Sequence, residues 1–394
     1  MQLDRGASRW LSPFGASPLF PFPYGNWCSI YSCYYFENYC NLLLQFAQIC
    51  DIIIVYIYYC KGEFIMKKII FASKNNAVLK DIPDRMPGDG ELRVKLAYTA
   101  LSAGTERALL TGNEEGGDGF RFGFPSSSGY SGSGVITDVG AGVTGFMPGD
   151  RVMVHGAGHQ EFAVLPEKEF VHVPDNVPLE QAALTIIAGF SLAAVRKAKI
   201  SLGDSVMVVG LGLLGLFAVQ YARLSGAYPV IAVDFSKERR EMAKTLGADI
   251  ALDPSEPGYT ELVKKLTNGG VRAVIEVTGN PRALKQSLSC TAKLGRVLLL
   301  GCTRTMTEVD FYHDVHQPGI ELIGAHSGAR PTLESHSGFF TEMDDCRVTL
   351  DYLSGGRLNF KPMIGEIHSP DDAHEVYSRL AEGKNFPIGV IFKW

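Results

Sequence analysis

The chain has 394 residues, of which 46% are hydrophobic and 20% are charged, and its formal net charge at pH 7 is −5. This length is sufficient for two domains of ordinary size, each with its own hydrophobic core. The weak negative charge leaves no basic surface for a polyanion, so nucleic acid is excluded as an expected partner. Only three of the eight cysteines lie beyond residue 65, and their wide spacing favours reduced thiols in a cytoplasmic protein over a disulfide framework.

The first 65 residues differ in composition from the rest of the chain, because they are rich in aromatic residues and cysteine and almost uncharged. The apolar run 42–60 is nearly long enough to cross a bilayer, but Gln45, Gln48 and Asp51 interrupt it. Met66 then opens a segment typical of the first strand of a soluble domain. We interpret residues 1–65 as an extension that is either not native or disordered, with a membrane anchor as the alternative, and otherwise expect no membrane partner.

Two patterns of secondary structure follow in chain order. Residues 66–188 alternate short strands with Gly- and Pro-containing turns, which predicts a mainly β domain with a first convincing helix at 180–187. Its expected strands are 92–97, 132–139, 151–155 and 161–165. Helices and strands then alternate over 189–325, which predicts a Rossmann-type, doubly wound parallel sheet. The expected strands there are 206–209, 230–233, 250–252, 273–277, 296–300 and 321–324. Helices are expected before and between these strands, the first of them at 190–199. The surplus strands of 326–394 are expected to return to the first domain.

A glycine-rich loop in the second domain carries the strongest functional signal. Gly210, Gly212 and Gly215 follow a charge-free strand and open an apolar helix. Glycines at these positions permit a tight turn, close approach of a pyrophosphate and helix packing on the strand, while the helix N-terminus offers free N–H groups. Asp234 ends the next strand at roughly the ~20-residue spacing expected of a carboxylate that binds a ribose diol. These features together predict a dinucleotide site, whereas the glycines alone would also suit an ordinary turn.

Five ordered motifs resemble the medium-chain dehydrogenase/reductase family over residues 66–394. They are 132–140, 148–152, 182–189, 210–215 and 274–279. The resemblance implies a GroES-like catalytic domain, an inserted Rossmann domain, a cleft between them and a homodimer or homotetramer. It also places the loops after the later strands beside the nicotinamide. The predicted cofactor-binding residues are Gly210, Gly212, Leu213, Leu214, Gly215, Asp234, Arg239, Thr278, Gly279, Leu300 and Gly301.

The chain departs from this family at its metal positions. Zinc-dependent members hold a catalytic zinc with two cysteines and a histidine, and a structural zinc with a four-cysteine loop. Here the corresponding positions are Ser102 or Ala103, Tyr130 and Ile187, and the four-cysteine loop is missing from the sequence. Zn²⁺ takes thiolate, imidazole or carboxylate ligands, so we predict no metal at either site. The turn 101–107 resembles a zinc-lacking branch that includes bacteriochlorophyllide dehydrogenase-type proteins, which oxidise a secondary alcohol with NAD.

Without zinc, a side chain must stabilise or protonate the alkoxide that develops during hydride transfer. Tyr130 is the first candidate because it replaces the metal-ligand histidine, although it would also serve simply to fill the vacated space. Ser102, Thr105 and Glu106 lie on the neighbouring turn and complete the predicted catalytic set. For Glu106, an acid–base role, a supporting role and an ion pair with Arg107 or another arginine all stay open.

Two features outside these motifs also stay open. His313 and His316 would share one face of a helical turn, a spacing that suits a metal but is commoner for surface or capping residues. Arg330 follows a predicted sheet strand and is a candidate contact for an anionic substrate group or a solvated side chain.

Asp234 would repel a 2′-phosphate and therefore favours NAD over NADP, with the basic residues Lys237, Arg239 and Arg240 interpreted as a solvated helix face. We predict a cytoplasmic, NAD-dependent, zinc-independent oxidoreductase that moves hydride between nicotinamide and a small secondary alcohol or ketone, such as a polyol or sugar derivative. The alternatives are an NADPH-dependent quinone or enone reductase and a nucleotide-binding protein without catalysis.

Overall fold

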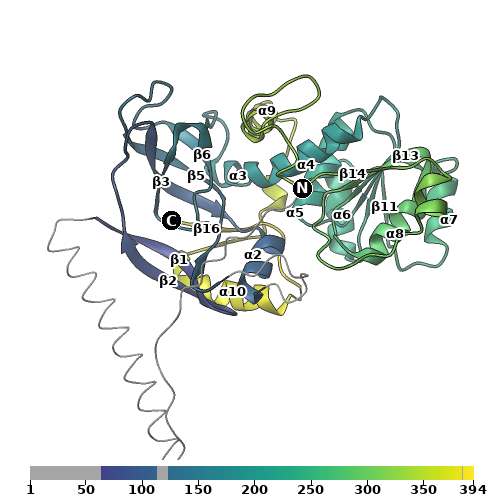
Figure 1. Cartoon of the computed structure of the whole chain (residues 1–394), viewed down its shortest axis with the longest axis horizontal. Helices are drawn as coiled ribbons and strands as arrows, with labels where there is room; N and C mark the ends of the chain where they lie inside the picture. Colours follow the sequence, from purple (N-terminus) through teal and green to yellow (C-terminus); the bar gives the residue numbers. More distant parts are fainter. Residues whose placement is uncertain (1–63, 113–122, 384) are drawn as a thin grey trace, which may run out of the picture. The chain divides into compact units, whose positions relative to one another are not determined.

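The computed structural model describes residues 64–112, 123–383 and 385–394, and our interpretation of the first 63 residues lies outside these described ranges. Three β-sheets organise the described part of the chain (Figure 1). None of the helices in these ranges combines the length and the apolar character that a membrane span needs.

A seven-stranded sheet combines strands that precede the glycine loop in sequence with two strands from the end of the described chain, and its path is β15-β16-β3-β5-β6-β8 with β7 paired to β3. Its strands are β3 (Glu91–Ala100), β5 (Ser131–Val139), β6 (Arg151–His155), β7 (Phe162–Pro166), β8 (Phe170–His172), β15 (Glu366–His368) and β16 (Val390–Lys393). A small sheet beside it has the order β2-β1-β4 and contains β1 (Ile65–Ser73), β2 (Asn76–Pro83) and β4 (Ser126–Ser127). The mainly β, GroES-like character expected of this part is thereby confirmed.

Helix α2 (Ala103–Thr111) was not expected, so the prediction that the first helix lies at 180–187 is wrong. Gly104 and Thr105 are weak helix formers, so helix propensity did not indicate a helix at these residues. It forms because Ser102 begins it, the Glu106 carboxylate accepts the backbone N–H of Ser102 at 2.7 Å, and Gly112 ends it in the left-handed conformation at φ 76°.

The predicted helices 180–187 and 190–199 are also divided in the wrong place. The structure has a short helix α3 (Leu179–Ala182) and a long helix α4 (Thr185–Ala198) that runs through Gly189 without a break. A Cβ at Gly189 would have its nearest neighbour 3.7 Å away, on Cys346. Most residues of α4 are buried, so tertiary packing, and not local propensity, keeps this glycine helical.

The second large sheet is fully parallel and has the order β11-β10-β9-β12-β13-β14, which confirms the doubly wound Rossmann prediction. Its strands are β9 (Val206–Val209), β10 (Val230–Val233), β11 (Ile250–Leu252), β12 (Val271–Glu276), β13 (Thr291–Leu299) and β14 (Glu321–Gly324). Helices α5 (Leu213–Leu224), α6 (Lys237–Thr245), α7 (Tyr259–Leu266) and α8 (Pro281–Cys290) connect them.

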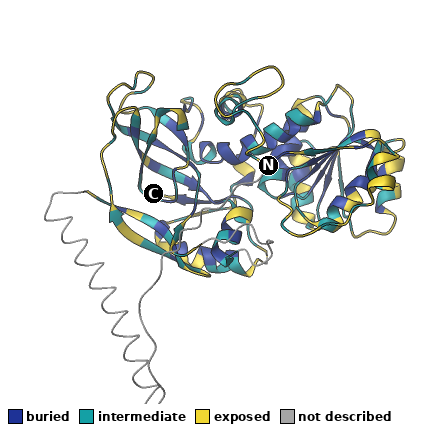
Figure 2. Ribbon diagram, viewed as in Figure 1, coloured by how far each residue is buried: buried dark blue, intermediate teal, exposed yellow. Residues whose placement is uncertain are grey.

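Alternating side chains of the central strand bind helices to both faces of this sheet. Val206 and Val208 pack in one apolar cluster with residues of α4 and α5, whereas Met207 and Val209 pack in another with residues of α7 and α8. These strands appear as the dark blue centre of the sheet in Figure 2. Each fully buried aliphatic side chain contributes about 1.5–3 kcal/mol, so the end of β9, where the glycine loop begins, is held on both sides.

The chain then returns from β14 to the first sheet. After the single-turn π-helix η2 (Phe311–His316) and β14 come α9 (Glu342–Ser354) and α10 (Ala373–Glu382), with short 3₁₀ turns η3 (Lys361–Met363) and η4 (Pro370–Asp372). Helix α9 packs against α4, while β16, the yellow strand of Figure 1, pairs with β3. The boundaries predicted at 188/189 and 325/326 stay predictions.

Candidate functional site

The glycine loop is shaped by two close backbone approaches. Gly210 has φ 93°, and a Cβ at Gly215 would lie 1.8 Å from the Gly210 carbonyl oxygen, so both positions exclude larger residues. Gly212 caps α5, and no atom of the described residues lies within 4 Å of where its Cβ would be. Leu213 and Leu214 follow in the first turn of α5, where backbone N–H groups lack intrahelical acceptors. The loop therefore offers open space and free donors suited to a pyrophosphate.

Asp234 lies directly after β10 and ties the glycine loop to the start of α6. Its Oδ2 accepts the backbone N–H of Leu211 at 2.8 Å, and its Oδ1 accepts that of Ser236 at 2.8 Å. Each carboxylate oxygen has a second lone pair, so both can also accept a hydroxyl. The carboxylate is thus held at the loop with capacity left for a ribose diol.

The basic side chains of α6 are only partly solvated, which corrects our expectation. Lys237 is exposed, but Arg239 and Arg240 are half-buried. The Arg239 Nη2 donates to the carbonyl of Phe386 at 3.4 Å, and Arg240 pairs with Asp253 at 2.9 Å. The role of Arg239 in cofactor binding stays a prediction.

The loops after β12 and β13 are organised by Glu276, a residue that the sequence reading missed. Glu276 is fully buried, and its carboxylate accepts the backbone N–H groups of Thr278 at 2.7 Å and Gly279 at 3.0 Å. Burial raises the pKa of Glu276, and these hydrogen bonds oppose the rise. The backbone N–H groups of Leu300 and Gly301 donate to the Glu276 carbonyl, so one residue holds both predicted nicotinamide loops together.

A pair of hydroxyl groups lies where the family resemblance places metal ligands. The Tyr130 hydroxyl donates to Ser102 Oγ at 2.7 Å, which joins the residue before β5 to the cap of α2. Burial raises the pKa of Tyr130, the charges of Glu106 and Glu342 raise it further, and hydrogen bonds with Ser102 and Thr105 lower it only in part. Tyr130 is therefore a neutral hydrogen-bond donor at physiological pH, and not a tyrosinate base.

Glu106 is fully buried beneath this pair, and its ion-pair partner is a histidine. The His159 Nε2 lies 3.1 Å from Glu106 Oε2, so the ion pair with Arg107 or another arginine, one of the three alternatives left open for Glu106, is wrong. The carboxylate also accepts hydrogen bonds from Ser128 Oγ at 3.1 Å and Tyr377 Oη at 2.5 Å. Burial alone would raise the pKa of Glu106, but the interactions with His159, Tyr377 and the backbone N–H of Ser102 together outweigh it and lower the pKa.

His159 was not a candidate from sequence, because it lies 53 residues from Glu106 and carries no motif. Its Nδ1 lies 2.7 Å from Thr99 Oγ1, which also accepts the indole N–H of Trp394 at 2.9 Å. Gly129 has φ 89°, and a Cβ there would lie 2.7 Å from the His159 ring. The buried histidine thus requires the glycine that precedes Tyr130.

The residues at the metal positions do not fit zinc. Ser102 and Tyr130 present hydroxyls that bond to each other, Ala103 presents a methyl group, and Ile187 is a buried alkyl side chain. Zinc sites in proteins use thiolate, imidazole or carboxylate ligands, and this set contains none of them. Elsewhere in the described ranges, no group of three or more His, Cys, Asp and Glu residues is arranged to hold a metal ion.

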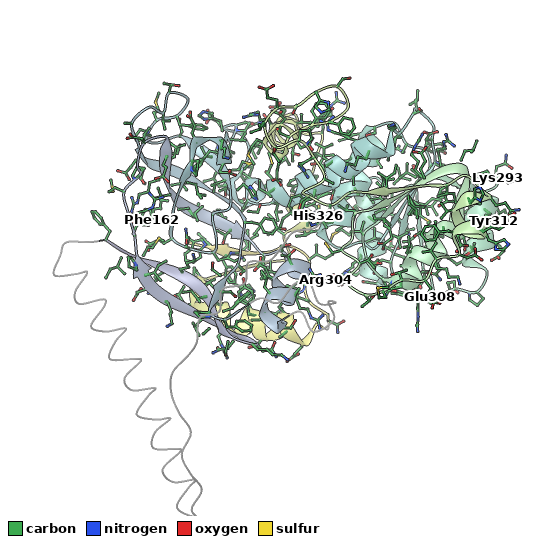
Figure 3. All side chains as sticks on the ribbon, viewed as in Figure 1. Phe162, Lys293, Arg304, Glu308, Tyr312 and His326 are labelled. Atoms are coloured by element: carbon green, nitrogen blue, oxygen red, sulfur yellow. The ribbon has the colours of Figure 1, made fainter. Side chains whose placement is uncertain are left out.

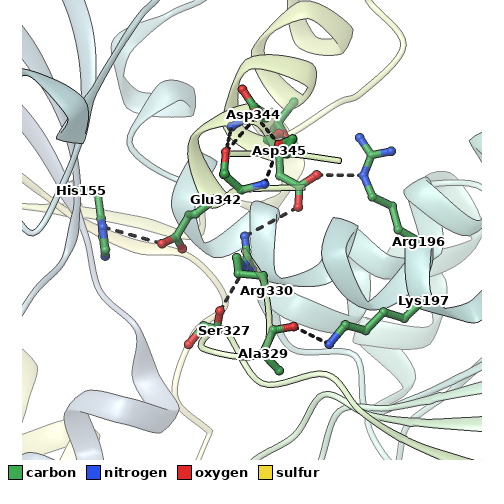
Figure 4. A network of polar contacts seen from close by, with 12 residues as sticks. His155, Arg196, Lys197, Ser327, Ala329, Arg330, Glu342, Asp344 and Asp345 are labelled. Atoms are coloured by element: carbon green, nitrogen blue, oxygen red, sulfur yellow. Dashed lines mark hydrogen bonds and ion pairs between the residues drawn. The ribbon is translucent and has the colours of Figure 1, made fainter. Parts of the chain in front are cut away.

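The two features left open by the sequence have different surroundings in the structure. His313 is exposed and its Nδ1 lies 2.8 Å from Asp310 Oδ2, on the outer segment around Tyr312 in Figure 3. Arg330 is not solvated, because its side chain is only 6% exposed. It lies 3.6 Å from Asp345, whose other oxygen accepts from Arg196 at 2.8 Å (Figure 4).

Comparisons with known proteins identify the family of this chain. The family described as "Alcohol dehydrogenase GroES-like domain" matches residues 88–175, and that described as "Zinc-binding dehydrogenase" matches residues 214–342. The L-threonine 3-dehydrogenase of Pyrococcus horikoshii is 33% identical over 344 residues, which cover 79% of this chain and 94% of the relative.

Solved structures share the fold. A zinc-binding-type dehydrogenase from Sinorhizobium meliloti bound to NADP is 23% identical with a TM-score of 0.72, covering 84% of this chain and 100% of that one. An alcohol dehydrogenase from Escherichia coli complexed with NADH is 20% identical with a TM-score of 0.72, covering 84% and 99%. The chain therefore belongs to the zinc-type, alcohol dehydrogenase-like family of medium-chain dehydrogenases and reductases, and it is an oxidoreductase that acts on alcohols (EC 1.1.1.-).

Proposed function

We propose that the protein is an NAD-dependent dehydrogenase that interconverts a small secondary alcohol and its ketone without a catalytic zinc. The observation that carries this proposal is the 2.7 Å hydrogen bond between Tyr130 and Ser102 at the metal-ligand positions. Two hydroxyls there provide a donor and an acceptor for a substrate oxygen, the task that zinc performs as a Lewis acid in other members. The proposal groups the protein with the zinc-lacking members that the turn 101–107 resembles.

A bound nicotinamide dinucleotide supplies the hydride acceptor or donor. The chain's own contribution is to hold and protonate the substrate oxygen. Because Tyr130 keeps its proton at neutral pH, its hydroxyl can turn from Ser102 to donate to the carbonyl oxygen of a ketone, and it then stabilises the alkoxide as it forms. In that state the Ser102 hydroxyl can donate to the Tyr130 oxygen in return, and Glu106 fixes Ser102 by accepting its backbone N–H at 2.7 Å.

NAD is the proposed cofactor because of Asp234. A 2′-phosphate on the adenosine ribose would be repelled by the Asp234 carboxylate, because both groups are negatively charged. Two backbone N–H groups hold this carboxylate, so it cannot easily rotate away from the phosphate. A free diol would instead donate to both of its oxygens. We further propose a cytoplasmic homodimer or homotetramer whose partner in catalysis is a small molecule.

The test is steady-state kinetics of the purified enzyme with NAD or NADP and a panel of secondary alcohols, ketones and polyols. We expect turnover with NAD that survives prolonged treatment with a chelator. Elemental analysis of the purified protein should find far less than one zinc ion per chain. Activity that is lost on chelation and restored by zinc would refute the zinc-independent mechanism. Turnover of enones with NADPH alone would favour a reductase instead, and tight NAD binding without any turnover would favour a non-catalytic protein.

Tyr130→Phe keeps the aromatic ring and removes the donor. We expect kcat to fall by roughly 10²-fold, the usual effect of removing one oxyanion donor, with KM for NAD unchanged. Tyr352→Phe on α9 is the matched control, because Tyr352 is 40% exposed and should leave kcat unchanged. An unchanged kcat in Tyr130→Phe would leave Tyr130 with a packing role only.

A further inference from the structure

Glu276 is a fully buried carboxylate that has no part in the hydroxyl pair, and its hydrogen-bond partners within the described ranges are uncharged. Its Oε1 accepts the backbone N–H of Thr278 at 2.7 Å and also the Thr278 hydroxyl, while its Oε2 accepts the backbone N–H of Gly279 at 3.0 Å. An amide of the same shape costs less to bury than an ionised carboxylate without a cation. Stability alone therefore gives no reason for a glutamate at this position.

The position requires an acceptor on both branches of the side chain. A glutamine could accept both donors of Thr278 with its oxygen, but its NH₂ group would then face the N–H of Gly279. Two donors would oppose each other there, and the N–H of Gly279 would lose its partner. The carboxylate thus holds the turn 277–279 in a way that its nearest neutral analogue cannot.

The turn 277–279 lies between two other loops of the cofactor site and touches both. On one side, a Cβ at Gly210 would lie 2.7 Å from Thr278 Cγ2, so the methyl group of Thr278 rests against the pyrophosphate loop. On the other side, a Cβ at Gly279 would lie 2.4 Å from the carbonyl oxygen of Cys302. No spare room separates the three loops, so a shift of the middle one changes its distance from its neighbours.

The backbone of Glu276 connects the same three loops. Its carbonyl accepts the N–H groups of Leu300 at 2.9 Å and Gly301 at 2.8 Å. In the parallel sheet Glu276 lies opposite Val209 on one side and Leu299 on the other, which are the last residues of β9 and β13. Glu276 therefore stands where all three loops leave the sheet.

We propose that Glu276 is a positioning residue that sets the separation between the pyrophosphate loop and the loops beside the nicotinamide. A dinucleotide must reach both sides at once, so this separation decides how well the two sides hold it together. A ligand that engages the pyrophosphate loop alone is insensitive to the separation. The inference rests on the proposed function, because it takes residues 277–279 and 300–301 as the nicotinamide side of the site.

Calorimetric titrations with NADH and with ADP-ribose test the proposal, because ADP-ribose keeps the pyrophosphate and lacks the nicotinamide. In Glu276→Gln, we expect the Kd for NADH to rise about 5-fold or more, since the buried N–H of Gly279 loses its acceptor. The Kd for ADP-ribose should stay within about twofold of the native value, because the glycine loop keeps its own contacts. We also expect kcat to fall by roughly 10²-fold, the effect of displacing a reacting group by about 1 Å.

Thr278→Ser changes the same separation from the other side. Serine keeps the hydroxyl that donates to Glu276 and removes the methyl group that rests against Gly210, so no buried charge is altered. We expect the Kd for NADH to rise about 2- to 10-fold, with the Kd for ADP-ribose again within about twofold. Glu261→Gln on α7 is the matched control, because it makes the same chemical change on an exposed side chain and should leave both constants unchanged.

Equal rises in Kd for NADH and ADP-ribose in Glu276→Gln would overturn the proposal, since the carboxylate would then support the site or the fold as a whole. So would unchanged binding of NADH in both variants. If Glu276→Gln loses its native circular dichroism spectrum, Thr278→Ser decides by the same comparison of the two ligands. Because these ratios come from binding, they decide the inference even where no alcohol is turned over, which is the failure of the proposed function.

Discussion

Replacement of His159 by leucine tests whether the buried ion pair under the hydroxyl pair holds the catalytic turn. The side chains of His159 and Glu106 are 0% and 1% exposed, so the leucine would leave a buried carboxylate without its ion-pair partner. Breaking a buried pair from one side costs about 3–5 kcal/mol. We expect the free energy of unfolding, measured by urea titration at pH 7.5, to fall by about that amount.

The loss should depend on pH in a defined direction. In the native protein the pKa of Glu106 is lowered, so the pair adds stability above the unfolded pKa of 4.5, and that stability disappears as the pH falls through the folded pKa. Without His159, burial raises the pKa of Glu106, and stability is lost as the pH rises above the unfolded value. The difference between native enzyme and variant should therefore be small near pH 4 and grow toward pH 7.5.

Two further variants isolate the charge. Glu106→Gln combined with His159→Leu should cost less than the sum of the single changes, with a coupling of about 1–3 kcal/mol, because no charge stays buried. Asp81→Asn is the control, since its pair with Lys67 is 50% and 55% exposed and contributes at most about 1 kcal/mol. A loss below about 1 kcal/mol in His159→Leu, independent of pH, would refute the reasoning.

Three other expectations follow from the cofactor loop and from the end of the main sheet. Gly215→Ala would force a Cβ to within 1.8 Å of the Gly210 carbonyl oxygen, so a thermal melt should show that the fold is destabilised by about 1–3 kcal/mol or more. Gly212→Ala has open space for its Cβ, so this variant should fold normally. It should bind NAD more weakly, as measured by fluorescence titration. Comparable melting temperatures for the two would contradict this. Asp234→Ser should raise kcat/KM for NADP and lower it for NAD, each by about 10-fold, and unchanged cofactor preference would remove Asp234 from its role. Trp394→Phe loses the indole hydrogen bond to β3 and should cost about 1 kcal/mol in urea unfolding, so a neutral result would show that this bond contributes nothing.

The parallel sheet could be predicted from the sequence because its signals are local. The strands Val206–Val209 and Val230–Val233 are charge-free, β-branched runs bounded by glycine or acid, and the structure places them at the predicted residues. The glycine loop could be predicted for the same reason, because the close approach of Gly215 to the Gly210 carbonyl oxygen is a contact between residues that are near each other in sequence.

The arrangement under Tyr130 could not be predicted, because its contacts are long-range. Glu106 lies 53 residues from His159 and 271 residues from Tyr377, and no periodicity connects them. The helix that carries Glu106 was missed for the same reason. Its weak helix formers Gly104 and Thr105 conceal it in the sequence, whereas its caps and the distant partners of Glu106 are seen only in the folded chain.

The pairing of β16 with β3 determines the order in which the two large sheets can be completed while the protein is being synthesised. Thr99 on β3 and Trp394 are 295 residues apart in the chain, yet they share a hydrogen bond next to the histidine that anchors the catalytic turn. As the polypeptide leaves the ribosome, the parallel sheet with its dinucleotide loop can complete all of its pairings first. The half that handles the substrate must wait, with part of β3 unpaired, until Val390–Lys393 has emerged. A nascent chain thus acquires the means to hold the cofactor before it can assemble the groups that hold the substrate.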